Sequence, residues 1–128
     1  MTRNLFATVF LAVALLFNAS AAFAGSGNKG TFTGASDHIT TGTVEIVQEG
    51  GNYVVKLGPD FSLDGAPDPK VGFGKDGQYV DGTLIGILKS LTGEQDYVVP
   101  ASLDISDFNE VYIWCEQFSV PLGVASLK

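Results

Sequence analysis

The chain of 128 residues contains one cysteine and one histidine, and its single methionine is the initiator. One cysteine cannot form a disulfide within the chain, so a disulfide framework is excluded. A blue-copper site usually takes two histidines and one cysteine, and a structural zinc site takes four ligands, so this donor set argues against both in one chain. The Cys-x-x-Cys-His signature of covalent c-type haem is also absent.

Positive charge is scarce. After residue 24 the chain has six lysines and no arginine against fourteen acidic residues, a net charge of about −8. Nucleic acids and anionic membrane surfaces are bound through clustered Lys and Arg. We therefore expect no nucleic-acid partner. The acidic surface is interpreted chiefly as solubilising, with a cationic partner or metal as the alternative.

A long hydrophobic run occurs only near the N-terminus. Arg3 supplies a positive charge, residues 5–17 are almost entirely apolar, and Ala22-Phe23-Ala24 has the small-x-small pattern that signal peptidases accept. The run is shorter than the roughly 20 apolar residues of a transmembrane helix. We expect residues 1–24 to be a signal peptide cleaved after Ala24, a periplasmic or secreted mature protein, and no stable membrane anchor after cleavage.

The remaining residues, about a hundred, are enough for one domain. Residues 25–29 are expected to be a flexible lead-in and residues 30–128 a single β domain. No helix-length amphipathic pattern occurs, whereas Gly, Pro, Asn and Asp punctuate short β-branched and aromatic runs. These features predict an antiparallel β-sandwich of about eight short strands, with a small closed β-barrel as the alternative.

Eight runs have strand character: residues 43–48, 53–57, 61–63, 71–73, 83–89, 96–99, 111–118 and 122–127. The first two are predicted to form a hairpin because a Gly-rich turn, residues 49–52, joins them. The longer apolar run at residues 83–89 is expected to be a buried strand. Residues 103–109 are expected to be a connecting turn, with one helical turn as a variant.

The lone cysteine lies in the predicted strand at residues 111–118. Since successive side chains of a strand point to opposite faces, Val111, Ile113 and Cys115 share one apolar face, which should point into the core. On that basis Cys115 would be a small buried hydrophobe. Tyr112 and Trp114 share the other face with a carboxylate, which suits a partly exposed surface or groove.

Several separated motifs together resemble the DM13 domain family. They are Gly30-Thr31-Phe32, residues 35–44 with the His-x-x-x-Gly-Thr element, residues 57–68, Leu84-Ile85-Gly86, residues 93–97, Pro100, and residues 111–115 ending in Trp-Cys, with Phe118 and Gly123. The resemblance covers almost all of residues 30–127. The Trp-Cys and His-x-x-x-Gly-Thr elements are specific in combination.

The resemblance implies an extracellular all-β module, found alone in bacteria and beside DOMON domains in animal cell-surface proteins. It also implies an electron-transfer or redox role centred on Cys115, as a free thiol or as a ligand to a prosthetic group such as haem, with an unidentified redox partner. The alternative function is a non-enzymatic extracytoplasmic binding or adhesion module, in which Cys115 only fills the core.

His38 and Trp114 are the supporting candidates for a cofactor site. Non-covalent haem held by Cys115, His38 or both is chemically allowed, because cysteine and histidine each serve as axial ligands. The alternative for His38 is a loop histidine that hydrogen-bonds the backbone. A shared role requires His38 to lie near Cys115, since a neighbouring imidazolium makes a thiol more reactive.

Two further patterns carry less weight. Asp60, Asp64 and Asp68, spaced by four, are oxygen donors of the kind that calcium prefers. The EF-hand pattern is absent, however, and two prolines stiffen the segment, which favours a solvated turn. The adjacency of Ser36, Asp37 and His38 is no evidence for a catalytic triad, whose members are recognised by their geometry.

Overall fold

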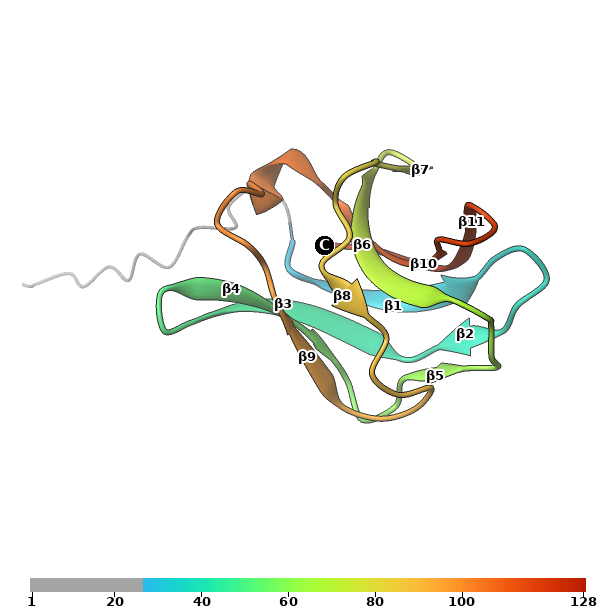
Figure 1. The fold of residues 1–128 in the computed structure, drawn as a ribbon. Coiled ribbons are helices and arrows are strands. Elements are labelled where there is room, and N and C mark those ends of the chain that lie inside the picture. The colour runs from blue at the N-terminus through green and yellow to red at the C-terminus, as the bar shows by residue number, and fades with distance from the viewer. Residues whose placement is uncertain (1–26) are drawn as a thin grey trace, which may run out of the picture.

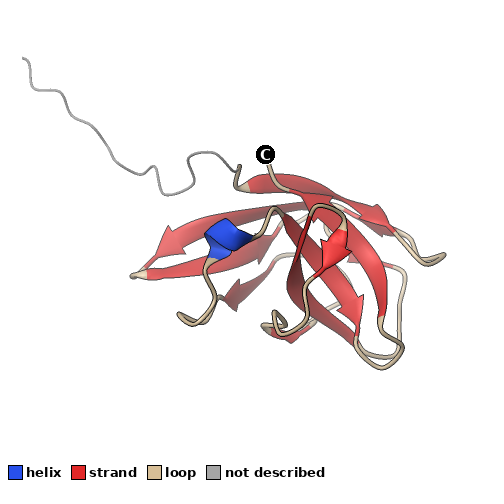
Figure 2. Ribbon diagram, turned by 90° about the horizontal axis from the view of Figure 1, so that it is seen from above, coloured by secondary structure: helices blue, strands red, loops and turns tan. Residues whose placement is uncertain are grey.

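The computed structural model describes residues 27–128, so the expected signal peptide and its cleavage site lie outside the described residues. The fold is all-β, and every strand pairing in it is antiparallel (Figure 1). Figure 2 shows the one helical element of this region, a 3-10 turn at Ile105–Asp107. The described part of the chain contains no helix with the length and hydropathy that crossing a membrane requires.

Residues 27–128 contain eleven strands. They are β1 (Lys29–Gly34), β2 (Thr40–Thr41), β3 (Thr43–Glu49), β4 (Asn52–Leu57), β5 (Ser62–Leu63), β6 (Pro69–Lys75), β7 (Gln78–Tyr79), β8 (Gly86–Ile87), β9 (Gln95–Val98), β10 (Glu110–Cys115) and β11 (Val120–Ser126). The main sheet has the order β7-β6-β10-β11-β1-β3-β4-β9, with β8 paired to β6, and β2 and β5 form a separate ribbon.

The main sheet bends at β1. The second half of this strand, residues 32–34, pairs with β11, whereas its first half, residues 29–31, pairs with β3. The two halves of the sheet are therefore folded over one core, as a half-barrel rather than as two separate sheets. The all-β antiparallel prediction is confirmed, and the curl of one continuous sheet produces the two facing layers.

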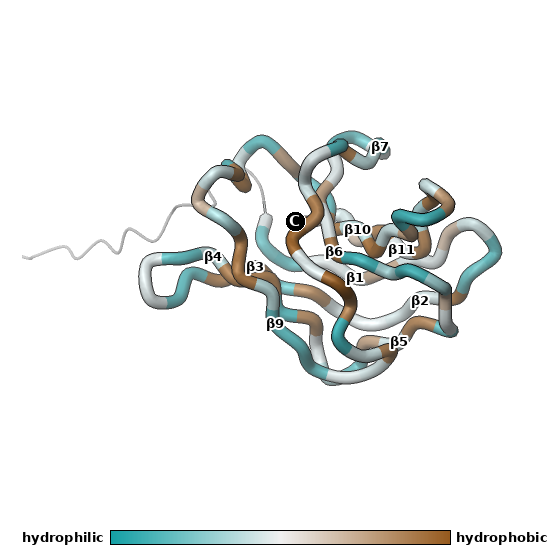
Figure 3. Tube along the Cα trace, viewed as in Figure 1, coloured by the Kyte–Doolittle hydropathy of each residue, from teal (hydrophilic) through white to brown (hydrophobic). Residues whose placement is uncertain are grey.

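The hairpin of β3 and β4 is formed as its sequence predicts. Val44 and Ile46 of β3 are buried in the core, and Thr43 and Glu45 alternate with them. Figure 3 shows apolar stretches along this hairpin. Gly50 and Gly51 connect the strands with φ angles of 59° and 86°. Positive φ at both positions is typical of the two-residue turns that match strand twist, and glycine adopts it without steric cost.

The prediction of a buried strand at residues 83–89 is wrong. Only Gly86 and Ile87 pair, with β6, and the Ile87 side chain is 68% exposed. The segment crosses instead from β6 toward the free edge of β9, where the Lys89 N–H donates to the Tyr97 hydroxyl at 2.8 Å. It therefore covers the open side of the half-barrel, with Leu88 buried in the core and Leu84 and Ile85 only partly buried.

The two ends of the described chain lie together. The Lys128 N–H donates to the Lys29 carbonyl at 2.8 Å. The neighbouring Asn28 accepts a hydrogen bond from the Ile46 N–H, also at 2.8 Å. The main sheet thus begins at Lys29, the first residue of β1, beside the last residue of the chain.

The core fills the space between the two halves of the sheet. Its buried members are Phe32, Val44, Ile46, Val55, Leu57, Phe61, Leu63, Val71, Phe73, Leu88, Tyr97, Val99, Val111, Ile113, Cys115, Leu122 and Ala125. They come from strands of both halves and from the segments beside them. Burying this apolar surface is the main favourable contribution to folding.

Candidate functional site

Cys115 is the last residue of β10 and points into the core. The alternation along β10 is as predicted, because Val111 and Ile113 are fully buried and the Cys115 side chain is 1% exposed. Neighbouring strands flank it on both sides, with Pro69 of β6 and Val120 of β11 as its paired positions. The thiol is free and enclosed by apolar residues.

The outward face of β10 carries an aromatic cluster, which we define as Tyr79, Tyr112 and Trp114. Trp114 stacks on Tyr79 with ring centroids 3.9 Å apart and planes 11° apart. Tyr112 meets both rings edge-on, at 5.9 and 6.3 Å. Tyr112 is only 4% exposed, more buried than the alternation predicts, because its ring lies over Gly74 of β6, which has no side chain.

The two phenols of this cluster both have a raised pKa. Burial raises the pKa of Tyr79 and, with a contribution from the Glu110 carboxylate, that of Tyr112. Glu110 is itself buried and accepts hydrogen bonds from the Gly77 N–H at 2.9 and 3.0 Å. The carboxylate thereby holds the turn that leads into β7, the strand that contributes Tyr79.

A pocket of about 620 Å³ adjoins the aromatic cluster. Its lining residues are Tyr79, Asp81, Gly82, Leu84, Trp114, Glu116 and Ser119. Lys70 lies beside it, with its ammonium paired to Glu116 and 3.6 Å from Asp68. Glu116 directly follows Cys115 in the chain, so the residue next to the cysteine lines this pocket.

His38 lies in the loop between β1 and β2. Its Nδ1 is 2.9 Å from Asp64 Oδ1, and the Ile39 N–H donates to Asp64 Oδ2 at 3.0 Å. The Ile39 N–H and the His38 ring together lower the pKa of Asp64. His38 is thus a loop histidine, as one interpretation expected, but its partner is a side-chain carboxylate rather than the backbone.

His38 and Cys115 lie toward the same end of the molecule, but their side chains do not interact. The segment Asp64–Asp68 runs between the two, because Asp64 binds the His38 ring and the Asp68 carbonyl accepts the Glu116 N–H at 3.2 Å. The imidazole faces a carboxylate, whereas the thiol faces the core. No hydrogen bond links the two side chains within residues 27–128.

Haem ligation by Cys115 does not fit this structure. The thiol is 1% exposed, and neither Cys115 nor His38 lines the pocket beside the aromatic cluster. For His38, Asp64 occupies Nδ1 and leaves Nε2 as the only nitrogen that could ligate a metal, an arrangement seen in histidines that a carboxylate orients. Within residues 27–128, no three His, Cys, Asp or Glu side chains lie close enough to hold a metal ion together.

The three aspartates of the suspected calcium pattern have separate partners. Asp60 accepts from the Thr43 N–H at 2.9 Å and from the Thr43 hydroxyl at 2.8 Å, which lowers the pKa of Asp60. Asp64 binds the His38 loop, and Asp68 faces Lys70. Each carboxylate therefore interacts with a different backbone or side-chain group, and the three do not converge on one site.

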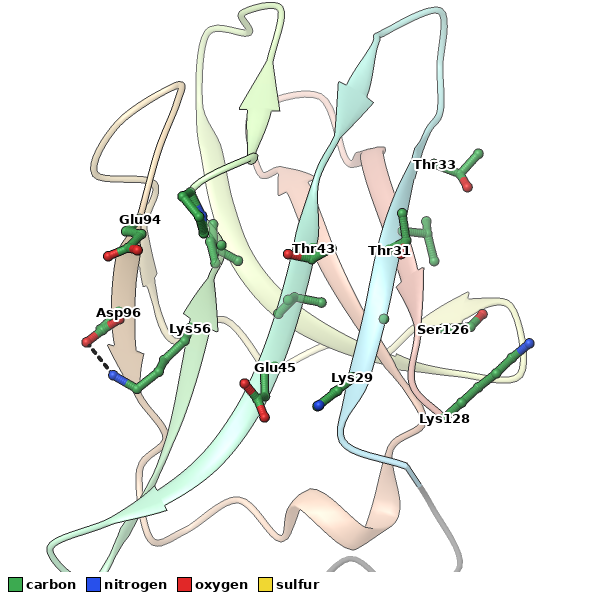
Figure 4. Close-up of a pocket in the computed structure, with 16 residues that line it drawn as sticks. Lys29, Thr31, Thr33, Thr43, Glu45, Lys56, Glu94, Asp96, Ser126 and Lys128 are labelled. Carbon is green, nitrogen blue, oxygen red and sulfur yellow. Dashed lines mark hydrogen bonds and ion pairs between the residues drawn. The ribbon is translucent and has the colours of Figure 1, made fainter.

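A second pocket, of about 990 Å³, crosses the outer face of β11, β1, β3, β4 and β9 (Figure 4). The hydroxyls of Thr31, Thr33, Thr43 and Ser126 lie along it, and Lys56 pairs with Asp96 at 3.0 Å across it. Its lining has no cysteine, histidine or aromatic residue. No local sequence pattern predicts this groove, since its lining comes from five strands.

Comparison with known proteins identifies a family. A family model described as "Electron transfer DM13" matches residues 31–127. No curated protein matches the chain, and no solved structure matches it either.

Proposed function

Because the chain belongs to the electron transfer DM13 family, we propose that it is an exported electron-transfer module whose redox group is the Cys115 thiol. The observation that supports this most is that Cys115 is free and yet 1% exposed. Thiol–disulfide exchange requires a thiolate to reach a sulfur atom directly, which this burial prevents. Electron transfer does not require contact with the sulfur, so burial is compatible with it.

The aromatic cluster supplies the route to the surface. Trp114 is bonded to Cys115 through the peptide, and its ring stacks on Tyr79 at 3.9 Å. The proposed step removes one electron and one proton from the thiol. The electron passes to an external one-electron acceptor, the proton to water, and a thiyl radical remains. Reduction by a one-electron donor with proton uptake reverses the step.

Voltammetry of the mature protein, residues 25–128, tests the proposal. A redox wave is expected in the wild type and should be lost in Cys115→Ser. Trp114→Phe should keep the wave and slow electron exchange with the electrode. An unchanged wave in Cys115→Ser would show that the redox group lies elsewhere in the molecule.

Burial of Cys115 also favours the alternative, a non-enzymatic binding or adhesion module in which the cysteine fills the core. In that case the wild type should show no wave, and Cys115→Ala should keep partner binding while losing stability. The two functions are thus separated by the voltammetry of one protein and one variant.

Export is part of the same proposal. It rests on the pattern of residues 1–24, which predicts cleavage after Ala24 and a periplasmic or secreted product. Mass spectrometry of the protein from the cell envelope and the medium should find a chain that begins at Gly25. An intact Met1 chain in the cytoplasm would contradict it.

A further inference from the structure

The pocket beside the aromatic cluster combines two flat rings with carboxylates. Tyr79 and Trp114, which stack on each other, are among its lining residues, and Asp81 and Glu116 contribute the charge. Both carboxylates are close enough to Tyr79 to add to the rise in its pKa, after the larger effect of burial. The rings and the carboxylates therefore line the same pocket, where one ligand could contact both.

The charge around this pocket is negative. The Lys70 ammonium is shared between Glu116 and Asp68, so one cation faces two anions. Asp81 is exposed and forms no ion pair or side-chain hydrogen bond with the described residues. The whole chain carries a formal net charge of −7. A positively charged group is thus favoured both locally and at long range.

A planar cation matches this geometry better than a compact one. A guanidinium stacks on aromatic faces and donates two parallel hydrogen bonds to a carboxylate, whereas an ammonium is a more strongly hydrated point charge. The stacked pair offers the face and Asp81 the acceptor. A protein partner supplies such a group as an arginine side chain, and arginine is common at the centre of interfaces.

We propose that this pocket binds the guanidinium group of an arginine on a partner protein. The binding does not depend on the redox role of Cys115. It would place the partner's surface against Trp114, the residue bonded to Cys115, and so at the point where the electron route reaches the surface.

The test uses Trp114, the only tryptophan of the chain, as the reporter. Its indole N–H signal is followed by NMR while N-acetyl-argininamide is added to the mature protein. The control ligand is N-acetyl-citrullinamide, which has nearly the same shape without the charge. The signal should shift and saturate with the arginine compound, less so at high salt, and stay in place with the citrulline compound.

Variants locate the site. Asp81→Asn should weaken binding about three- to tenfold, whereas Asp107→Asn, in the 3-10 turn, should leave it unchanged. Free arginine, whose own carboxylate would face Asp81, should bind more weakly than the amide, as expected for a site that takes an arginine within a protein. Cys115→Ser should bind like the wild type, so that a failure of the redox proposal is told apart from a failure of this one.

Three results would overturn the inference. They are equal shifts with the arginine and citrulline compounds, no shift with either, and an Asp81→Asn variant that binds like the wild type. A shift with a neutral oligosaccharide in place of the arginine compound would assign the pocket to a sugar instead. The dispersed NMR spectrum of each variant checks its folding in the same experiment.

Discussion

At the scale of single residues, the contacts of Cys115 and His38 explain what their sequence context could and could not predict. Strand alternation was enough to predict that Cys115 points inward, because Val111 and Ile113 on the same face of the strand are apolar. The partner of His38 could not be predicted, because Asp64 lies 26 positions away and meets it only through folding. The stacking of Tyr79 on Trp114 is long-range in the same way.

Replacing the buried thiol should cost stability. Cys115→Ala removes a side chain that packs in the core and is expected to lower the free energy of unfolding by about 1–3 kcal/mol, as other large-to-small core changes do. Urea unfolding measures the loss. The exposed Ser102→Ala serves as the control and should be neutral. In the native wild type, the thiol should react with a thiol reagent only as fast as the core opens, and fast labelling would contradict its burial.

Acid should weaken the protein through Asp60. Its folded-state pKa lies below the usual value of 3.8, first because the Thr43 N–H donates to it and then because the Thr43 hydroxyl does. For a carboxylate with a lowered pKa, the stabilisation is present above the unfolded pKa and is lost as the pH falls through the folded one. The urea concentration at the unfolding midpoint of the wild type should therefore fall once the pH is lowered below about 4.

The matched variants for this pH dependence are Asp60→Asn and Asp107→Asn. Asp60→Asn should be less stable than the wild type at pH 6 and should lose less on acidification. Asp107, whose carboxylate accepts no hydrogen bond from the described residues, should change neither the stability nor its pH profile when replaced by asparagine. Parallel pH profiles for Asp60→Asn and the wild type would contradict the assignment.

At the scale of elements, strands that contain a local apolar run were predicted, whereas β1, β2 and β7 were not. β3, β4, β10 and β11 alternate or carry continuous apolar runs, and all four form at or near their predicted positions. β1 was missed, because Phe32 is its only buried side chain and its other residues are small or polar. Its extended form comes from hydrogen bonding with β11 and β3, which only the folded chain brings together.

The pairing of β6 with β10 depends on Gly74. A Cβ at this position would overlap the Tyr112 ring and approach the Gln78 carbonyl oxygen to 2.7 Å. Gly74→Ala should therefore destabilise the fold by about 1–3 kcal/mol, as overpacking does, and shift the Trp114 fluorescence by moving the aromatic cluster.

Gly72→Ala, in the same strand, is the control for this change. Its Cβ would approach only side-chain atoms, the flexible end of Leu84 at 3.0 Å, the Tyr79 ring at 3.2 Å and the Thr83 hydroxyl at 3.3 Å, instead of overlapping a ring at 2.2 Å as at Gly74. The loss in urea midpoint should be clearly smaller than for Gly74→Ala. Equal losses would show that the cost comes from the sheet in general and not from the Tyr112 contact.

At the scale of the whole molecule, β1 makes the two halves of the half-barrel depend on each other. One part of β1 pairs with a strand of one half and the other part with a strand of the other half. The core between the halves contains residues from both. Neither half can keep its apolar face covered without the other. The fold class was predictable from short runs and turns, whereas the curl of one sheet was not, because it arises from a strand with no apolar pattern.

Unfolding should therefore be a single transition. Trp114 fluorescence reports on the half with β10, and NMR signals of the β3–β4 hairpin report on the other half. Their urea curves are expected to coincide. Gly30→Val, whose side chain would overlap the Ser126 carbonyl oxygen beside β1, should lower both midpoints together. A shift confined to one half would show that the halves unfold independently.

The hydrogen bond between Lys29 and Lys128 has a consequence for how this module can be attached to others. Its two ends leave side by side, while the loops near His38 and Cys115 lie beyond the far end of β1. Such a module can be inserted into a surface loop of a host protein, or circularly permuted through the exposed Gly50-Gly51 turn, without breaking its sheet. A tether at either end would leave the loops of His38 and Cys115 facing away from the anchor, open to a partner.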